Sequence, residues 1–467
     1  MRCELLFPLF LLACVINGLP VVGAPPVLSM HFKLLRRHHR QRSPLQRVRE
    51  IVRNDHARAK MISDRIGWQR SACVAGGSVP RTSSFAMPIS SAAFTGTGQY
   101  FVRLKVGTPA QTFLLVADTG SDLTWMKCRY RACRGCGDAQ WRRAFRADQS
   151  SSFSPIPCSS QLCKNSLPFS LAKCLAPTSP CEYDYGYTDG STARGIFADE
   201  VATVALSGGQ SAKLKGIVVG CTSSSAGSSF RSLDGVLGLG YSNTSFAARA
   251  ASRFGGKFSY CLVDHLSPRN ASDYLVFGKD TIHRPSKPDR RRYAELILNS
   301  WLEPFYAVRV GGVSVGAELL NISEAVWDSG AGGGVILDSG TSLAMLAEPA
   351  YRAVLAALSA PLARYPKVEA KPFEFCFKWD QSFDEAAVPR LVVHLVGPRG
   401  AAAPLRPPVK SYLIDVADGV KCIGILSASW PGVSTIGNIL QQNHLWEFDI
   451  ANRRVSFEPS SCSRSLH

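Results

Sequence analysis

Two short segments, far apart in the chain, follow the same pattern. Residues 113–122 read FLLVADTGSD and residues 334–342 read GVILDSGTS, so each is an apolar run ending on Asp, then Thr or Ser, then Gly. The two aspartates, Asp118 and Asp338, lie 220 residues apart. A single Asp-x-Gly is ordinary turn chemistry, but repetition of the whole pattern indicates an internal duplication. Such a chain is expected to fold as two similar units, each ending a buried strand on a carboxylate.

A second matched element follows each copy. It is an apolar run that closes on glycine, DGVLGLG at 234–240 in the first half and VSTIGN at 433–438 in the second. The same order of parts in both halves argues for two homologous β lobes. We expect these lobes to bring Asp118 and Asp338 to their junction, where pockets commonly form.

The composition supports a mostly β protein. With 467 residues, 46% of them hydrophobic, the chain is long enough for two lobes with real cores. Short apolar runs recur between Gly, Ser and Pro residues, and long helical periodicities are few. A helix is expected at Glu348–Leu358, where Pro349 lies near the first turn. The clearest expected strands are Tyr100–Val106, Thr112–Ala117, Gly216–Gly220, Tyr274–Phe277, Tyr306–Val310 and Leu445–Asp449.

These motifs resemble those of the pepsin-like aspartic proteases, and within them the plant nepenthesin-like branch. The resemblance covers about residues 98–462 and rests on GQYFVRLKVGTPAQ, ADTGSDLTWMKC, CEYDYGYTDGS, DGVLGLG, FSYCLVDH, ILDSGTSLAML and IGNILQQNHLWEFD. It implies a mostly β, bilobal pepsin-like acid protease fold with an active-site cleft between the lobes. It also implies an aspartic endopeptidase that acts on protein or peptide substrates and needs no cofactor or metal.

When two carboxylates share a site, ionisation of both is unfavourable because the like charges repel, so one keeps a proton while the other stays charged. The ionised member can take a proton from a water that attacks the scissile carbonyl, while the protonated member donates to the carbonyl oxygen. The two apparent pKa values belong to the pair, so acid and base are not assigned to Asp118 or Asp338 individually.

Neighbouring residues are expected to set the geometry of the two carboxylates. Gly120 and Gly340 let the chain turn tightly behind them. The resemblance implies that Thr119 and Ser339 join the two loops by hydrogen bonds. It also implies that Ser121 and Thr341 bond the outer carboxylate oxygens. Outside this motif, the same hydroxyls would be interpreted as turn formers.

A hairpin is expected at 183–195, where YDYGYTDGSTARG alternates tyrosines and then turns. The ordinary purpose of such alternation is cross-strand packing. The resemblance makes this hairpin the flap that closes over substrate, with Tyr187 as the flap tyrosine and its hydroxyl near the indole of Trp125. Thr188 departs from the family, which usually has glycine there. Because Thr188 is β-branched, it is expected to stiffen the hairpin, and so to change the rate of flap opening or the shape of the subsite.

The cysteines indicate disulfides. Twelve cysteines lie from Cys128 to Cys462, an even number suited to as many as six bridges in an oxidising compartment. Zinc is the rival interpretation, since Cys133 and Cys136 are spaced C-x-x-C, but no second such pair stands nearby. Seven of the cysteines lie in 128–181, which indicates a disulfide-stapled insert in the first lobe. The pairing is left open.

The N-terminal region carries most of the excess charge. The formal net charge is +18, and residues 25–85 hold 13 Lys and Arg against 3 Asp and Glu. A removable basic prosegment over an acidic cleft explains this, because opposite charges favour association. A solvated arm and a nucleic-acid arm are the alternatives; the second ranks last because aromatic residues are not interleaved with the charges.

The sequence divides into four expected parts. They are a signal peptide at 1–24, a basic prosegment at 25–85, a first catalytic lobe at 86–278 and a second at 279–467. The signal peptide, and candidate glycosylation sites at Asn243, Asn270 and Asn321, indicate the secretory pathway, with an extracellular or vacuolar destination. The Arg-rich, acid-poor stretch that follows also resembles a transit segment, so the chloroplast is the alternative.

Three functional classes are compatible with these features. The first is an active endopeptidase, expected to be a monomer without a membrane span and inhibited by its own prosegment. The second is an inactive pepsin-fold binding or inhibitor protein, like the xylanase-inhibitor relatives that have lost catalytic-motif residues. The third is a basic nucleic-acid-binding protein. The intact Asp118 and Asp338 motifs favour the enzyme.

Overall fold

The structure is a computed structural model of the chain. It describes residues 43–69, 85–91, 98–130, 141, 143–166, 174, 176–186, 192–206, 210–226, 233–267, 273–278 and 291–462. The expected signal peptide, Cys133, Cys136, Asn270, Tyr187 and Thr188 lie outside these residues. Within the described chain, no helix has both the length and the apolar character needed to cross a bilayer.

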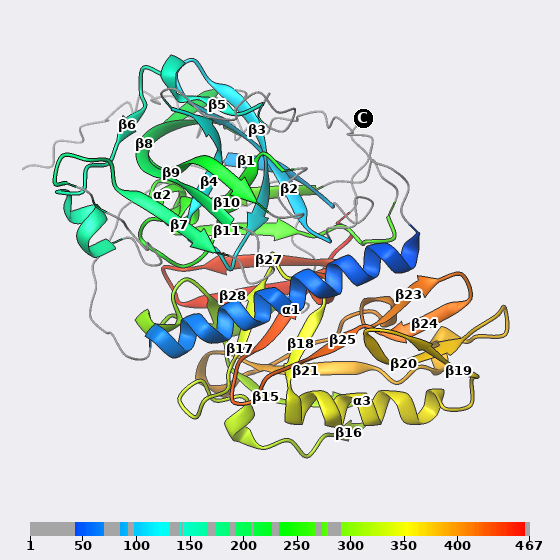
Figure 1. The fold of residues 1–467 in the computed structure, drawn as a ribbon. Helices are drawn as coiled ribbons and strands as arrows, with labels where there is room; N and C mark the ends of the chain where they lie inside the picture. The colour runs from blue at the N-terminus through cyan, green and yellow to red at the C-terminus, as the bar shows by residue number, and fades with distance from the viewer. Residues whose placement is uncertain are drawn as a thin grey trace, which may run out of the picture.

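The protein is mostly β and has two lobes, as the sequence predicts (Figure 1). The first lobe contains β2 (Tyr100–Val106), β3 (Gln111–Asp118), β4 (Thr124–Arg129), β5 (Phe145–Arg146), β6 (Ser154–Pro155), β7 (Glu182–Gly186), β8 (Thr192–Ala205), β9 (Ser211–Ala226), β10 (Gly235–Gly238) and α2 (Phe246–Ala251). The second contains β14 (Tyr306–Val308), β15 (Val310–Val315), β16 (Glu318–Leu319), β17 (Val335–Asp338), β18 (Ala344–Ala347), α3 (Glu348–Leu362), β19 (Lys367–Ala370), β20 (Phe373–Lys378), β21 (Leu391–Val396), β22 (Ala402–Leu405), β23 (Leu413–Ala417), β24 (Val420–Ile423), β25 (Ile425–Ala428), β26 (Ser434–Gly437) and α4 (Asn438–Gln441).

Six further strands pair with one another where the lobes meet. They are β1 (Phe85–Ser91), β11 (Lys257–Cys261), β12 (Asp273–Phe277), β13 (Arg292–Ile297), β27 (His444–Asp449) and β28 (Arg454–Pro459). β11 pairs with β27 in antiparallel register, and the Cys261–Cys462 disulfide joins the end of β11 to the chain just after β28. The expected strands all fall on observed ones, although Tyr306–Val310 is divided between β14 and β15. The expected helix is α3, which continues to Leu362.

The duplicated sequence pattern corresponds to a duplicated strand arrangement. In the first lobe, β3 pairs in parallel with β10, so that Asp118 lies opposite Gly238. In the second lobe, β17 pairs in parallel with β26, so that Asp338 lies opposite Gly437. The side chains of β17 and β10 are buried throughout. β3 is buried over its last four residues, so each aspartate ends its strand in a buried stretch at an equivalent position of its lobe.

Ten cysteines of the described chain form five disulfides. The pairs are Cys128–Cys221, Cys158–Cys174, Cys163–Cys181, Cys261–Cys462 and Cys376–Cys422. This confirms the prediction of disulfides and supplies the pairing. The sulfurs of Cys158, Cys163 and Cys174 lie within 4.8 Å of one another, but all three belong to disulfides and so offer no thiolate to a metal.

A helix that the sequence analysis did not predict, α1 (Pro44–Gln69), crosses the boundary between the lobes (Figure 1). Its start is a reciprocal cap, in which the backbone N–H of Gln46 bonds Ser43 Oγ and that of Ser43 bonds Gln46 Oε1. One face is apolar and packs in two places on the second lobe. Ile51 and Val52 contact one cluster, and Met61, Ile62 and Ile66 contact another.

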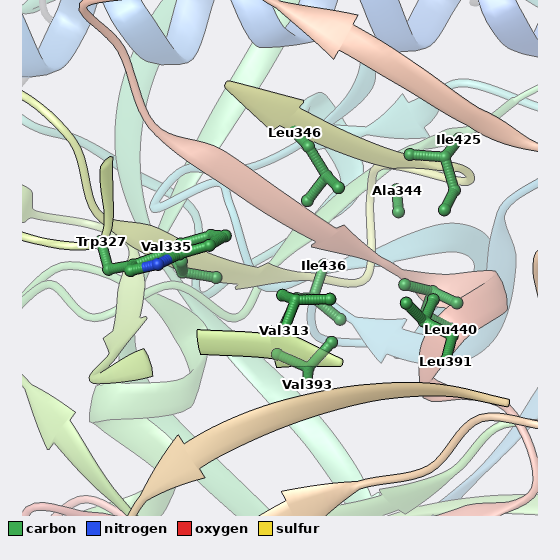
Figure 2. Close-up of a pocket in the computed structure, with 10 residues that line it drawn as sticks. All are labelled: Val313, Trp327, Val335, Ala344, Leu346, Leu391, Val393, Ile425, Ile436 and Leu440. Carbon is green, nitrogen blue, oxygen red and sulfur yellow. The ribbon is translucent and has the colours of Figure 1, made fainter. Parts of the chain in front are cut away.

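The second lobe contains a small internal cavity of about 20 Å³ beneath β17 and β26 (Figure 2). Val335 and Ile436 contribute from these strands, and Trp327 covers one side. The whole lining is apolar. A water there would have no polar partner, so we interpret the cavity as a dry packing gap and not as a ligand site.

Candidate active site

Asp118 and Asp338 meet at the junction of the two lobes. They are 2% and 0% exposed, although they end strands in different lobes. The proximity is such that a Cβ at Gly340 would lie 2.3 Å from Asp118 Oδ1, and one at Gly120 would lie 2.8 Å from Asp338 Oδ1. Both positions therefore require glycine, because any side chain would displace the opposite carboxylate.

The two aspartate loops are joined by reciprocal hydrogen bonds. The backbone N–H of Thr119 donates to Ser339 Oγ at 3.0 Å, and that of Ser339 donates to Thr119 Oγ1 at 2.9 Å. The two hydroxyls donate onward to backbone carbonyls of the opposite lobe, Thr119 to Leu337 at 3.4 Å and Ser339 to Ala117 at 2.9 Å. All these groups are buried. The contact fixes the relative position of the loops.

Each carboxylate is also held by its own loop. The inner oxygen of Asp338 accepts from Gly340 N–H at 2.8 Å, and its outer oxygen accepts from Thr341 Oγ1 at 2.6 Å. Asp118 accepts the matching bonds from Gly120 N–H, at 3.0 Å, and from the Ser121 hydroxyl. The site therefore has approximate two-fold symmetry down to individual donors.

Arg58 of α1 lies between the two carboxylates. Its Nη2 donates to Asp118 Oδ1 at 2.5 Å and to Asp338 Oδ1 at 2.9 Å. Its Nε donates to Asp338 Oδ2 at 2.5 Å, and its Nη1 to Asp118 Oδ2 at 3.0 Å. The Arg58 side chain is 12% exposed, so this is a largely buried charge cluster. The guanidinium group of Arg58 thus donates hydrogen bonds to all four oxygens of the two carboxylates.

The charges in this cluster influence one another. Burial raises the pKa of Asp118 above its usual value, and the nearby Asp338 adds to the effect, while Arg58 opposes it. Burial would lower the pKa of Arg58, but the two aspartates outweigh burial and raise it. Arg58 therefore remains charged, and it favours the ionised form of Asp118.

Asp55, one helical turn before Arg58, forms a second contact of α1 with the aspartate motif of the second lobe. Its carboxylate accepts from the backbone N–H groups of Ser342, at 2.9 Å, and Leu343, at 2.7 Å. Asp55 is 2% exposed. Burial raises its pKa to about 7, with a further contribution from Asp338, although the two backbone bonds and Arg58 act in the opposite direction.

The expected flap is described only in part. β7 and β8 form the antiparallel hairpin that the sequence predicts, but Tyr187, which follows β7 in the sequence, lies outside the described residues. Trp125 on β4 is 1% exposed, in a cluster that includes Tyr183. Tyr183 packs against Phe197 and its hydroxyl bonds Thr222, so this tyrosine serves packing. A contact between Tyr187 and Trp125 stays a prediction.

The remaining candidate residues lie on the surface. Asn243 and Asn321 are exposed, as acceptors of a glycan must be.

The sequence analysis predicted neither Arg58 nor Asp55. The signal that could have found them is an apolar stripe at Leu45, Val48, Val52, Ala59, Ile62 and Ile66, which has helical spacing and is interrupted by an acidic residue at 55.

Known protein families and relatives match this chain over most of the two lobes. The family profile described as Xylanase inhibitor N-terminal matches residues 100–279, and Xylanase inhibitor C-terminal matches 305–459. Aspartyl protease family protein 2 of Arabidopsis thaliana is 35% identical over 390 residues, which cover 82% of this chain and 75% of that protein. Aspartic proteinase nepenthesin-1 of Nepenthes gracilis is 30% identical over 384 residues, 81% of each chain.

Solved structures share the fold at lower identity. Basic 7S globulin from soybean superposes with a TM-score of 0.63 and 19% identity, covering 83% of this chain and all of that one. Conglutin gamma from lupine seeds gives 0.60 and 18%, covering 81% of this chain and 95% of that one. The sequence relatives, at 30% identity or more over most of their length, show that the chain belongs to the plant aspartic protease family that includes the nepenthesins.

Proposed function

We propose that this protein is an aspartic endopeptidase whose catalytic groups are Asp118 and Asp338. One observation carries the proposal. Two carboxylates from equivalent places in two lobes meet in a buried site, and each is held by a matching glycine N–H and hydroxyl. Matched surroundings give neither carboxylate a strong preference for the proton, which suits a pair that shares one and is not expected of a purely structural ion pair.

In the proposed reaction the pair acts without a covalent intermediate. With one proton shared between Asp118 and Asp338, the ionised carboxylate accepts a proton from a water as that water attacks the peptide carbonyl. The protonated carboxyl donates to the carbonyl oxygen, and the resulting tetrahedral intermediate then collapses with proton transfer to the leaving amine. The hydrogen bonds between Thr119 and Ser339 keep both groups in place during these transfers.

The second candidate is an inactive binding protein of the same fold. The xylanase-inhibitor description of the matching profiles and the seed globulins among the solved structures make it worth testing. The enzyme is favoured because both aspartates, both glycines and all four supporting hydroxyls are present and correctly bonded. The nucleic-acid alternative is weaker, since a basic residue of the N-terminal segment is directed at the carboxylate pair.

In the described form, α1 would keep the enzyme latent. Arg58 occupies the carboxylate oxygens that a water and a substrate carbonyl would need, and Asp55 anchors the helix one turn away. This supports the expected role of residues 25–85 as an inhibitory prosegment. Because β1 (Phe85–Ser91) pairs with β2 and β12, we propose that the removable segment ends where this strand begins, close to the expected boundary at 85. The disulfides suit the proposed secretory route.

Cleavage of a denatured protein by the full-length chain should occur at acid pH and should stop when pepstatin is added. At acid pH the aspartates take up protons, which weakens their contacts with Arg58 and releases α1. We therefore expect the chain to process itself before it cleaves the added protein. A metal chelator and a thiol-blocking reagent serve as controls and should have no effect. Cleavage that resists pepstatin but is lost in the chelator would refute the proposed mechanism, and absence of cleavage across the pH range would favour the binding protein.

Docking of α1 should also weaken as the solution becomes alkaline. The pKa of Asp55 is about 7 when α1 is docked and near 3.8 when it is not, so docking is linked to proton uptake. The contribution of Asp55 to docking is therefore complete below about pH 4 and is lost as pH rises through about 7. Hydrogen exchange of the α1 amides, corrected for intrinsic rates, should accelerate as pH rises through about 7. In an Asp55→Asn variant this pH dependence should disappear; an unchanged dependence would be inconsistent with the assignment.

A further inference from the structure

Asn438 is a buried amide that links the catalytic loop of the second lobe to the first lobe. It is the first residue of α4 and is 0% exposed. Its Nδ2 donates to the carbonyl of Ser339, at 3.0 Å, and to the carbonyl of Gly98, at 2.9 Å. Gly98 lies just before β2 in the first lobe, whereas Ser339 directly follows the catalytic Asp338. A single side chain thus contacts both lobes next to the carboxylate pair.

The backbone around Asn438 holds the same loop. The N–H of Asn438 donates to the carbonyl of Thr341 at 2.8 Å, and the N–H of Ile439 donates to that of Ser342 at 3.0 Å. With the side-chain bond to Ser339, three of the four residues that follow Asp338 are fixed from this one turn. Ser339 and Thr341 are the residues that bond the opposite lobe and the outer oxygen of Asp338.

The first lobe shows that the fold itself does not require an amide here. Leu239 occupies the equivalent position, because it follows Gly238, which lies opposite Asp118, as Asn438 follows Gly437, which lies opposite Asp338. Leu239 is also 0% exposed, and its N–H bonds the carbonyl of Asp118 at 2.8 Å. The duplicated strand arrangement therefore accepts leucine in one lobe and has asparagine in the other.

The amide at 438 also carries an energetic cost. Among the residues that the structure describes, no donor reaches Asn438 Oδ1, although the atom is buried. A buried acceptor without a partner is destabilising, because it has lost its hydrogen bonds to water. Its orientation is fixed, because only the NH₂ group can face two carbonyl oxygens. The two bonds made by Nδ2 must offset this cost, which points to a role beyond filling space.

We propose that Asn438 is a positioning residue for catalysis, which sets the Asp338 loop against the first lobe through Ser339 and Gly98. The inference rests on the proposed peptidase function. Loss of the amide should let the loop shift relative to Asp118, and a displacement of about 1 Å in a catalytic group can lower a rate by about 10²-fold. Because substrate contacts elsewhere are untouched, the loss should appear in kcat and not in KM.

Two variants test this proposal in the full-length chain after activation at acid pH. Asn438→Leu copies the residue of the first lobe, and we expect kcat to fall by about 10- to 100-fold with little change in KM. Asn438→Asp keeps the size and shape of the side chain, but a carboxyl group that faces two carbonyl oxygens can donate a hydrogen bond only when it is protonated. Its kcat relative to wild type should therefore recover as pH falls. If Asn438→Leu does not fold, Asn438→Asp decides the question.

The matched control is Gln441→Leu on the same short helix. Gln441 is also a buried amide, but its bonds go to Tyr260 and the Ile436 carbonyl and not to the loop after Asp338. The Gln441→Leu protein should be less stable than wild type, but its folded fraction should keep the wild-type kcat and pH profile. Hydrogen exchange across 339–343 should accelerate only in the Asn438 variants, a readout that needs no activity. The proposal would be overturned if both Asn438 variants had the wild-type kcat, the wild-type pH profile and unchanged hydrogen exchange. An inactive wild-type protein would instead count against the peptidase function alone.

Discussion

Replacement of Asp338 by asparagine is expected to reduce kcat/KM for peptide cleavage by about 10³-fold or more, and Asp118→Asn should have the same effect. Loss of general acid–base catalysis by one group typically costs about 10²–10⁴-fold. The amide can neither take the proton from water nor share one with its neighbour, so both roles of the pair are lost together. The measurement is initial-rate cleavage of a peptide substrate, with folding checked by circular dichroism.

A carboxylate outside the site provides the control. Asp415 lies in the same lobe, is exposed and is paired with Lys421, so Asp415→Asn removes an equal charge from a group that bonds Lys421 and not the carboxylate pair. It should retain nearly full activity. The side-chain carbonyl introduced by Asp338→Asn can still accept the Gly340 N–H, so the loop should keep its shape. An Asp338→Asn or Asp118→Asn protein with more than about a tenth of wild-type activity would exceed the small residual expected when general acid–base catalysis is removed.

The second large effect is expected from Arg58→Gln, which should make the full-length chain active without prior processing. Loss of one partner from a buried charge pair typically costs about 3–5 kcal/mol, and each 1.4 kcal/mol is a factor of ten in an equilibrium. The equilibrium for release of α1 should therefore shift by about two to four orders of magnitude. Cleavage measured in the first minutes at mildly acid pH, before self-processing, reports this release.

Arg53→Gln is the matched control for the same helix. Arg53 is exposed on α1, and its replacement removes one positive charge without touching the carboxylate pair. It should leave the chain latent. Arg58→Lys should give intermediate latency, because a lysine offers a single charged nitrogen and cannot bridge four oxygens. Equal latency of the Arg58→Gln, Arg53→Gln and wild-type chains would show that Arg58 does not block the site.

Much of the fold and of the carboxylate pair could be predicted from the sequence, because both follow from local patterns that occur twice. An apolar strand followed by Asp, a hydroxyl residue and glycine specifies where each carboxylate lies within its own lobe. Repetition then implies a shared junction for Asp118 and Asp338. The disulfide-rich character was predictable from the number of cysteines, but their pairing was not, since pairing depends on strands that are distant in sequence.

The contacts of α1 were not predictable in the same way. The basic composition of residues 25–85 indicated a segment for an acidic partner, yet Arg58 is only one of 13 basic residues there. Selection of Arg58 requires knowing which face of the helix meets the second lobe, and Asp55 would be interpreted as solvated from sequence alone. Asn438 was also missed, because its importance appears only when its two carbonyl partners, Ser339 and Gly98, are seen together.

The pH dependence of kcat/KM for the activated wild-type enzyme tests the central claim most directly. If Asp118 and Asp338 share one proton, activity requires one ionised and one protonated carboxyl, so the profile must be bell-shaped with two ionisations that both belong to the pair. We predict such a bell in the acid range. A profile with a single limb, in which activity depends on only one ionisation, would contradict the account.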